Sequence, residues 1–267
     1  MAVFHSTMKE SVLHFDFSGL TSKLRVIMGK YLSPFAEKSL INNCNQIVCV
    51  SQITIDEFRT TYNIPTNDFI YSPNCIDGTI FCDTNSHREK YICHIGRIDY
   101  GKGIFSLLNA IHNLRTTLIK SGFRFIFVGT GKLEPAFIQK LEELDIKPYV
   151  KKIDHLPQDE LPHLLNGSAY SIINSKYETG PRVALESMAT STPVISTKVG
   201  LLSNISAAES YIPIDRSIED AISYAINTFG SNNYKKLQLK SQEFVSDYLC
   251  INAKVSVPKL IMELINE

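Results

Sequence analysis

Short apolar runs alternate with longer segments of helical periodicity from Lys90 onward, and this alternation constrains the fold more than any other feature. The apolar runs end at Gly96, Gly129, Ile153, Ser175 and Thr197. The segments between them, 103–120, 134–144, 159–165 and 181–189, have apolar residues at helical spacing. Strands that alternate with helices are typical of β-α-β units in a parallel sheet. We therefore expect an α/β protein with a Rossmann-like, doubly wound sheet whose ligands bind at the carboxyl ends of the strands.

The chain before Lys90 has a different pattern. A short strand at 2–4 precedes a long stretch of helical character, and two more strands follow in QIVCVS and DFIYSP. Three strands are too few for an independent sheet with both faces covered, so we expect self-association or a complementing chain. The domains that we predict are a partial N-terminal α/β domain (1–77), a polar linker (78–89), a complete Rossmann-like domain (90–245) and a C-terminal helix that packs back toward the N-terminal part (246–267).

Charge and hydropathy exclude several classes of protein. The 27 Lys and Arg residues balance the 27 Asp and Glu residues, so the chain lacks the positive field of a nucleic-acid binder. No apolar stretch reaches the ~18 residues of a transmembrane helix, and the opening segment is too short for a signal peptide. We expect a cytoplasmic protein. Residues 1–40 hold five Lys or Arg and three Asp or Glu among apolar residues, a composition compatible with peripheral contact at the inner face of a membrane.

Cysteines and histidines do not form a metal-binding pattern. The sequence has no C-x-x-C pair and no H-E-x-x-H motif. No Asp-x-Asp pair is present to hold a diphosphate through a metal, so we expect no metal and no cofactor. Because most cysteines stand in apolar runs, we expect buried free thiols; the cysteines are Cys44, Cys49, Cys75, Cys82, Cys93 and Cys250.

A first candidate site follows the strand that ends at Gly96. Arg97 comes directly after this strand, and Lys102 and Gly103 precede the next helix in HIGRIDYGKGI. Two cations at a helix amino terminus provide fixed positive charge and backbone N–H groups for a diphosphate. The alternative is that both side chains are solvated surface charges.

A second candidate site is the segment NSKYETGPRVALESMA. Glu178 lies in a loop after a strand, and Glu186 follows inside a helix that we expect to begin near Pro181. Glu186 stands on an apolar helix face, so its buried carboxylate needs hydroxyl or amide partners such as those of a ribose. The alternative is a pair of capping and surface glutamates.

Together these motifs resemble the retaining nucleotide-sugar glycosyltransferases of the GT-B fold, glycosyltransferase family four. The resemblance rests on Gly96-Arg97 with Lys102-Gly103, on Gly129-Thr130-Gly131, on YETGPRVALESMA followed by STPVIST, and on PNCID at 73–77. It begins midway through the family's N-terminal domain. Thr179-Gly180-Pro181 departs from the family's sugar loop, so the donor sugar stays open.

The resemblance implies a role for each matched residue on the nucleotide side of the donor. Arg97 and Lys102 would hold the diphosphate and stabilise the leaving nucleotide. Glu186 would bind the ribose hydroxyls. His155 and Leu156 stand where the family's base-binding backbone falls.

On the sugar side, the resemblance implies that Glu178 and His5 contact the donor sugar at its reacting face as the catalytic residues. The backbone of Thr179 and Gly180 would orient the sugar and the phosphate, and Gly96 belongs to the same donor-binding set.

The resemblance thus implies a glycosyltransferase that moves a hexose from a UDP- or GDP-sugar to a carbohydrate or lipid-linked acceptor, with retention, in cell-surface polysaccharide biosynthesis. Two alternatives stay open. One is a nucleotide-sugar-binding remnant without turnover, or one half of a split enzyme. The other is a sugar-nucleotide epimerase of the same fold.

Overall fold

The computed structural model describes residues 2–4, 33–44, 47–62, 69–204 and 207–252. His5, one of the two predicted catalytic residues, lies outside the described residues, as does most of the segment 1–40 that we expect to contact a membrane. Among the described helices, none combines the length and the apolar character that a membrane span requires.

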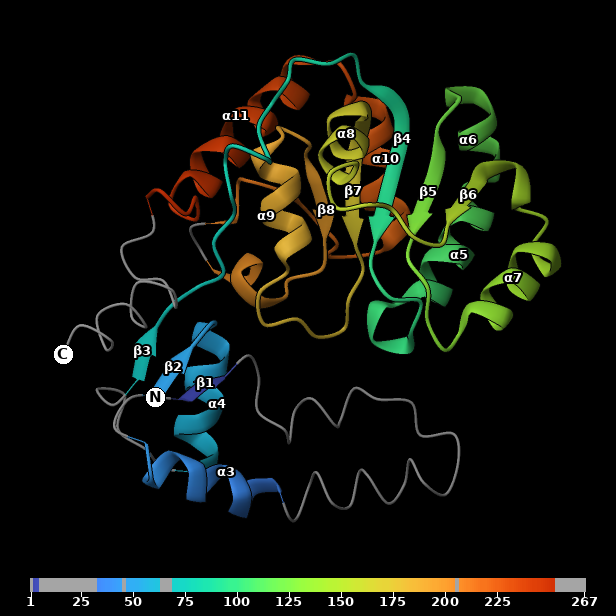
Figure 1. Ribbon diagram of the computed structural model, residues 1–267. Helices are drawn as coiled ribbons and strands as arrows, with labels where there is room; N and C mark the ends of the chain where they lie inside the picture. Colours follow the sequence, from blue (N-terminus) through green and yellow to red (C-terminus); the bar gives the residue numbers. More distant parts are fainter. Residues whose placement is uncertain (1, 5–32, 45–46, 63–68, 205–206, 253–267) are drawn as a thin grey trace.

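The centre of the molecule is a six-stranded parallel sheet (Figure 1). Each of the five strands expected after Lys90 is present, and a further short strand completes the sheet. In spatial order the strands are β6 (Val150–Ile153), β5 (Arg124–Val128), β4 (Glu89–Ile95), β7 (Ser168–Ile173), β8 (Val194–Ser196) and β9 (Ile212–Pro213).

Apolar side chains alternate between the two faces of this sheet. Phe125 and Phe127 of β5 point into one core, and Ile126 and Val128 point into the other. Burial of both faces is the reason why these strands read as nearly continuous apolar runs.

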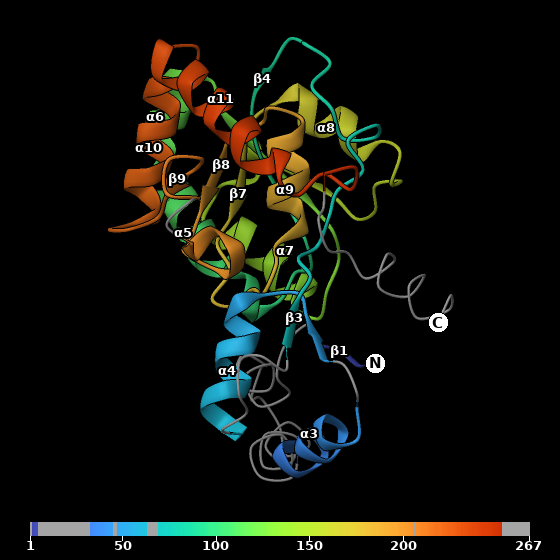
Figure 2. The same ribbon diagram turned by 90° about the vertical axis from the view of Figure 1, so that its left-hand side faces the viewer.

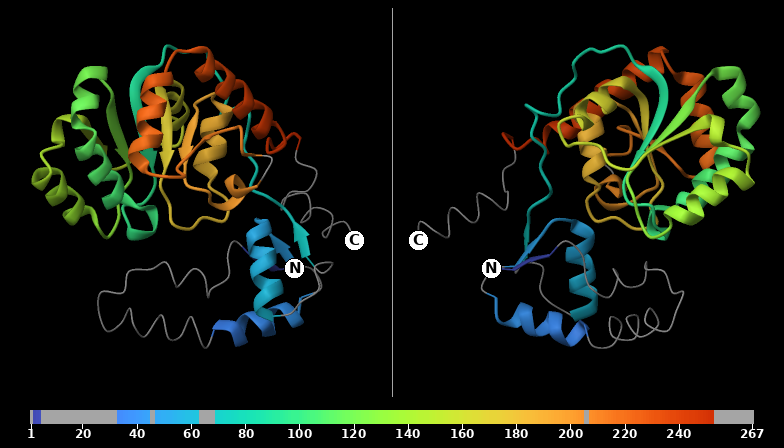
Figure 3. Two further views of the ribbon diagram at one scale, coloured as in Figure 1. Left: turned by 180° about the vertical axis from the view of Figure 1, so that it is seen from behind. Right: turned by 45° about the vertical axis from the view of Figure 1, so that its right-hand side comes forward.

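Helices cover both faces of the sheet, as a doubly wound fold requires (Figure 3). On the first face lie α5 (Ile104–Asn113), α6 (Arg115–Ser121), α7 (Glu134–Glu143) and α10 (Ile218–Thr228). On the second lie α8 (Leu161–Gly167) and α9 (Arg182–Ala189), with α11 (Asn232–Ser246) packed against α9. Short 3-10 turns, η3 (Tyr100–Lys102), η4 (Lys147–Tyr149) and η5 (Gly200–Ser203), lie in the connections.

One helix prediction needs correction, and another is confirmed. The single helix expected at 103–120 is two helices that meet at Leu114, which ends α5 and begins α6. The apolar spacing continues through Leu114 and Leu118, both buried, so periodicity alone does not reveal the break. The helix expected near Pro181 is confirmed: α9 begins at Arg182, and Pro181, with an extended backbone, is its N-terminal cap residue.

A smaller parallel sheet forms the N-terminal part, with the order β1 (Ala2–Phe4), β2 (Ile47–Cys49) and β3 (Phe69–Tyr71). Two helices, α3 (Ser33–Asn42) and α4 (Gln52–Tyr62), lie beside it (Figure 2). Ile55, Phe58 and Tyr62 form one buried stripe of α4, and the Tyr62 hydroxyl donates a hydrogen bond to the buried carboxylate of Glu37.

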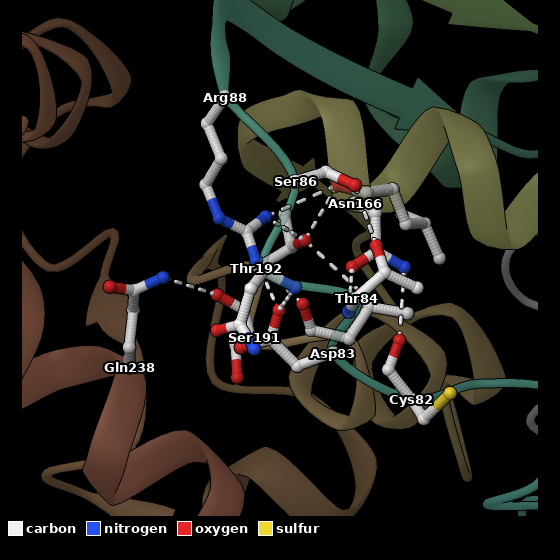
Figure 4. Close-up of polar contacts among 12 residues, drawn as sticks. Cys82, Asp83, Thr84, Ser86, Arg88, Asn166, Ser191, Thr192 and Gln238 are labelled. Carbon is white, nitrogen blue, oxygen red and sulfur yellow. Dashed lines mark hydrogen bonds and ion pairs between the residues drawn. The ribbon is translucent and has the colours of Figure 1, made fainter.

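The segment that we expected to be a polar linker is fastened to the six-stranded part (Figure 4). The Asn166 side chain accepts a hydrogen bond from the Thr84 backbone N–H and donates one to the Cys82 carbonyl, both at 3.0 Å. The Arg88 guanidinium donates to the Thr190 carbonyl and to the Thr192 hydroxyl, each at 2.7 Å. Residues 82–88 are therefore fastened at Cys82, Thr84 and Arg88 to the chain beside the amino ends of the strands, although most of their side chains are exposed.

After α11 the chain turns and returns to the end of the N-terminal part. Leu249 forms a parallel bridge with Ile76, so residues 247–252 lie beside the crossover that follows β3 (Figures 1 and 2). The helix predicted over 246–267 is not present at residues 247–252, which form turns around this bridge; the rest of that range lies outside the described residues.

The prediction that the cysteines are buried holds for Cys49 and Cys93, which lie within the two parallel sheets. It is wrong for Cys82 and Cys250, which are exposed, and for Cys44 and Cys75, which are half-buried. Cys44 lies just after α3, Cys75 and Cys82 lie between β3 and β4, and Cys250 lies after α11. At such positions an apolar run in the neighbouring sequence does not imply a place in the core.

Candidate functional site

The strand order reverses direction between β4 and β7. From β4 the chain proceeds outward to β5 and β6, and then returns to place β7, β8 and β9 on the other side. Loops that leave neighbouring strands on opposite sides of the sheet open a crevice at this point, and open α/β sheets bind their ligands there. The two motifs predicted as candidate sites follow β4 and β7, so the fold brings them together at this crevice.

The loop after β4 carries the predicted cations. Asp99 accepts a hydrogen bond from the Lys102 backbone N–H at 3.1 Å and so caps η3. Arg97 is largely exposed, with an ion pair of 3.4 Å from its Nε to Asp99 Oδ2. Lys102 is mostly covered, with its side chain 23% exposed. Arg97 is thus a surface charge, whereas the Lys102 side chain is turned toward the loop after β7, where it pairs with Glu178.

Glu178 and Lys102 form an ion pair across the crevice. The Glu178 carboxylate is 19% exposed and also accepts a hydrogen bond from the Ser175 hydroxyl at 2.9 Å. These contacts join the loop after β7 to the loop after β4, because Lys102 follows the first strand and Glu178 the second. The predicted partners of a diphosphate and a donor sugar therefore lie within contact distance of each other.

Close backbone packing explains the glycines in this region. A Cβ atom on Gly103 would lie 2.2 Å from the Asn174 carbonyl oxygen, and one on Gly129 would lie 2.2 Å from the Gly96 carbonyl oxygen. Gly103 also has a left-handed backbone (φ +63°) where α5 begins, a conformation that glycine adopts without strain. These positions let the strand-end loops approach one another, and the structure gives Gly96 and Gly129 a packing role.

Glu186 lies in the second turn of α9 and is buried, with only 6% of its surface exposed. Burial raises the pKa of its carboxyl group, and the positive charge of Arg182 partly opposes that rise. Arg182 Nη2 lies 3.6 Å from Glu186 Oε1. Glu186 is therefore a buried carboxylate, as expected from its place on an apolar helix face, and it needs hydroxyl or amide hydrogen-bond donors.

Thr179 and Gly180 lie in the loop between β7 and α9, wedged between other segments. A Cβ atom on Gly200 would lie 2.6 Å from the Thr179 carbonyl oxygen. The Asn74 side chain donates a hydrogen bond to the Gly180 carbonyl at 3.2 Å. The loop is therefore held by the chain after β8 and by the crossover after β3.

His155 and Leu156 follow β6 at the same edge of the sheet, two strands away from β4. His155 is exposed, and Leu156 is half-buried against the second core. The structure thus places them on the correct edge but does not bring them into contact with Lys102 or Glu178.

Sequence reasoning missed Asn174, a buried residue directly after β7. Its side chain donates hydrogen bonds to the Gly103 carbonyl at 2.8 Å and to the Ser106 hydroxyl at 2.9 Å. Asn174 therefore fixes the start of α5 beside the crevice. A polar residue at the carboxyl end of an apolar strand is the signal that could have identified it.

His94 of β4 was also missed, because it stands within the apolar run KYICHIG. Its Nδ1 lies 3.2 Å from the Ile172 carbonyl oxygen, while its buried Nε2 has no hydrogen-bond partner. That nitrogen lies 3.8 Å from the position of a Cβ on Gly96, as does Lys102 Cε. Burial, assisted by the charge of Lys102, lowers the pKa of His94 to about 4, so the imidazole beneath the crevice is neutral at pH 7.

A separate cavity of about 500 Å³ lies at the other end of the sheet, between β9, α10 and α11. Its lining mixes acidic and basic side chains, among them Asp215, Arg216 and Lys236, with Tyr224. None of the predicted site residues lines it. Among the described residues, no group of three or more His, Cys, Asp or Glu side chains is arranged to hold a metal ion.

Comparison with known proteins gives one family. The sequence profile described as "Glycosyl transferases group 1" matches residues 80–243, more than half of the chain. An uncharacterised glycosyltransferase of Methanocaldococcus jannaschii is 31% identical over 117 residues, which are 44% of this chain and 29% of the relative. Glycogen synthase of Thermodesulfovibrio yellowstonii is 30% identical over 189 residues, 68% of this chain and 37% of the relative. The chain thus matches less than half of the length of these curated relatives.

Solved structures show the same fold. Anabaena HepE in complex with UDP and glucose superimposes with a TM-score of 0.73 at 16% identity, over 99% of this chain and 70% of that protein. Sucrose-phosphate synthase from Thermosynechococcus elongatus superimposes with a TM-score of 0.74 at 17% identity, over 99% and 67%. The GT-B type of α/β fold predicted from the sequence is confirmed.

Proposed function

Because this chain belongs to the glycosyl transferases group 1 family, we propose that it transfers a hexose from a nucleoside diphosphate sugar to a carbohydrate or lipid-linked acceptor, with retention of anomeric configuration as in glycosyltransferase family four. The observation that carries this proposal is the Lys102–Glu178 ion pair at the point where the strand order reverses. It joins a cation suited to a phosphate and a carboxylate suited to sugar hydroxyls in one crevice.

In this proposal the donor diphosphate lies over the loop after β4. Lys102 exchanges its ion pair with Glu178 for contact with the phosphate oxygens, and Arg97 turns from Asp99 to the same group. Fixed positive charge at this place stabilises the negative charge that develops on the departing nucleotide. Glu178 is then available to accept hydrogen bonds from the sugar.

Glu186 would accept hydrogen bonds from the two ribose hydroxyls. A buried carboxylate is costly without such donors, and hydrogen bonds to its charged form counter the effect of burial on its pKa. Ribose binding should therefore favour the ionised form of Glu186. Uridine is the first base to test, since a neighbour of the same fold was solved with UDP and glucose.

We further propose that the reaction needs no metal, that the product is a cell-surface polysaccharide, and that the protein works in the cytoplasm, in part at the inner face of the membrane. A relative named glycogen synthase supports a carbohydrate acceptor. The positive charges of Lys102 and Arg97 would replace those of a metal ion at the diphosphate.

A ligand-dependent thermal shift tests the donor site. With UDP, GDP or their hexose conjugates at a hundredfold their dissociation constant, the stability of the protein should rise by ~2.7 kcal/mol. Lys102→Ala should weaken binding by about 2 kcal/mol through the loss of a charged hydrogen-bond donor. Arg115→Ala, which removes an exposed arginine of α6, is the matched control and should bind as the unchanged protein does.

Product analysis then separates turnover from binding. Nucleotide release that requires an acceptor, together with an α-linked product from an α-linked donor, is the expected result. Donor binding without nucleotide release would favour a binding module or one half of a split enzyme. Release of nucleotide with a rearranged sugar and no acceptor would favour an epimerase.

A further inference from the structure

Two cysteines that are far apart in the sequence, Cys75 and Cys250, lie against each other where the chain crosses between the smaller and the larger sheet. Their sulfur atoms are 2.7 Å apart, and both are free thiols. A covalent sulfur–sulfur bond measures ~2.05 Å, so the two atoms need to approach by less than about 1 Å to be joined.

The backbone around the two thiols is already paired. The Ile76 N–H donates a hydrogen bond to the Tyr248 carbonyl, and the Cys250 N–H donates one to the Ile76 carbonyl, both at 2.9 Å. The bridge between Ile76 and Leu249 therefore holds the two backbone segments that carry the thiols next to each other.

The other four cysteines provide a contrast. Cys49 and Cys93 are buried in two different cores, Cys82 is exposed, and Cys44 is half-buried at the end of α3. The sulfur–sulfur contact found among the described residues joins Cys75 and Cys250 alone. Of this pair, Cys250 is exposed and Cys75 is half-buried, so a small oxidant can reach them from solvent.

We propose that Cys75 and Cys250 form a reversible intramolecular disulfide that fastens the crossover after β3 to the segment after α11. The oxidant is a small-molecule disulfide such as oxidised glutathione. One protein thiolate attacks a sulfur of the oxidant, whose bond breaks to release one thiolate. The second protein thiolate then attacks the mixed disulfide and displaces the other half. The products are one protein disulfide and two reduced thiols, which take up the two protons.

The place of this bond gives it a structural consequence. Asn74, next to Cys75, holds the Gly180 carbonyl in the loop between β7 and α9. Cys250 lies on the other side of the bridge. The positive charge of Arg182, at the start of α9, favours the thiolate of Cys250 and partly opposes the rise in its pKa. Oxidation would therefore restrain the crossover beside the candidate donor loop. The inference stands without the proposed sugar transfer, because it concerns only the two thiols and the backbone that they join.

The rate of oxidation should depend on pH. Burial and the adjacent Cys75 thiol raise the pKa of Cys250 to about 11, so its thiolate is scarce at neutral pH and increases about tenfold with each pH unit. We expect attack by the Cys250 thiolate to be slow at pH 7 and about a hundredfold faster at about pH 9.

Intact-mass measurement after incubation with oxidised glutathione tests the bond. The unchanged protein should lose two hydrogen masses, and a digest should contain a linked peptide that joins Cys75 to Cys250. Cys75→Ser and Cys250→Ser should each abolish this loss, whereas the matched control Cys82→Ser, which removes an exposed thiol, should retain it. Glutathione adducts without loss of hydrogen, or the same loss in Cys250→Ser, would overturn the proposal.

Amide hydrogen exchange tests the restraint. In the oxidised protein, the amides of Ile76 and Cys250 should exchange about tenfold more slowly than in the reduced protein, because the crossover after β3 and the segment after α11 can no longer separate. Reduction with dithiothreitol should restore the faster exchange. Equal exchange of these amides in the two forms would show that the bond restrains nothing.

Discussion

His94 makes a prediction at the scale of one residue. Its pKa is lowered to about 4 by burial and by the charge of Lys102, and it should return to ~6.5 in the unfolded chain. Between these values the unfolded state binds one more proton than the folded state. The free energy of unfolding therefore falls by up to ~1.4 kcal/mol for each pH unit as the pH decreases from 6.5 to 4.

Urea titrations across this pH range, with His94→Leu, measure the contribution. The variant has no imidazole at position 94 to take up a proton on unfolding. Its free energy of unfolding should therefore depend less steeply on pH than that of the unchanged protein. His87→Leu is the control, because His87 is exposed and its removal should leave the slope nearly as it was. Parallel slopes for all three proteins would show that His94 is protonated equally in both states.

The residues found from the sequence and the residues missed differ in a physical way. The sequence pointed to Lys102 and Glu178 because each follows an apolar strand, and to Glu186 because it stands on an apolar helix face; the structure pairs the first two and buries the third, while their roles at a donor stay predictions. Asn174 could not be predicted, because its importance comes from a contact with the Gly103 carbonyl that depends on how two loops approach. The unpartnered nitrogen of His94 is likewise visible only when the surrounding side chains are in place.

Arg88 makes a prediction at the scale of an element. Its guanidinium donates hydrogen bonds to the Ser168 carbonyl at 3.1 Å and, at 2.7 Å each, to the Thr190 carbonyl and the Thr192 hydroxyl. With a side chain only 9% exposed, it fastens the segment before β4 to α9 and β7 (Figure 4).

Arg88→Ala leaves these carbonyl groups without their charged donor and should lower the free energy of unfolding by about 3 kcal/mol. Arg88→Lys should recover only part of this loss, since an ammonium group cannot reproduce the planar fork. Arg124→Ala is the matched control, because Arg124 is exposed and donates to a single carbonyl; its effect should stay within about 0.5 kcal/mol. Equal losses for Arg88→Ala and Arg124→Ala in urea denaturation would contradict this account.

Elements with continuous apolar pattern were the easiest to predict. The central strands β5 and β7 could be located because both faces of the sheet are buried there, which leaves an apolar run in each. The break at Leu114 and the turns after Ser246 could not, because apolar residues continue across both. The fastening of residues 82–88 was missed because polar composition alone does not distinguish a free linker from one held by Arg88 and Asn166.

At the scale of the whole molecule, the sequence predicted two α/β parts joined by a crossover but could not predict how they contact. Self-association, a complementing chain and membrane contact stay predictions. One of the contacts between the two parts illustrates this dependence on three-dimensional packing: the Tyr177 hydroxyl donates a hydrogen bond of 2.9 Å to Glu57 of α4. Tyr177 directly precedes Glu178, so this bond ties the N-terminal part to the loop that carries the candidate catalytic carboxylate.

Tyr177→Phe removes this hydrogen bond and keeps the ring. A hydrogen bond of this kind contributes about 1 kcal/mol, so opening between α4 and the loop after β7 should become about fivefold more frequent. Hydrogen exchange followed by mass spectrometry should show faster exchange in peptides that cover residues 176–180 and the start of α4. Tyr224→Phe, at a half-exposed tyrosine of α10, should change neither peptide. If exchange in both regions is the same for Tyr177→Phe and the unchanged protein, the two parts are held together by contacts other than this one, and Glu178 is positioned from the six-stranded part alone through Lys102 and Ser175.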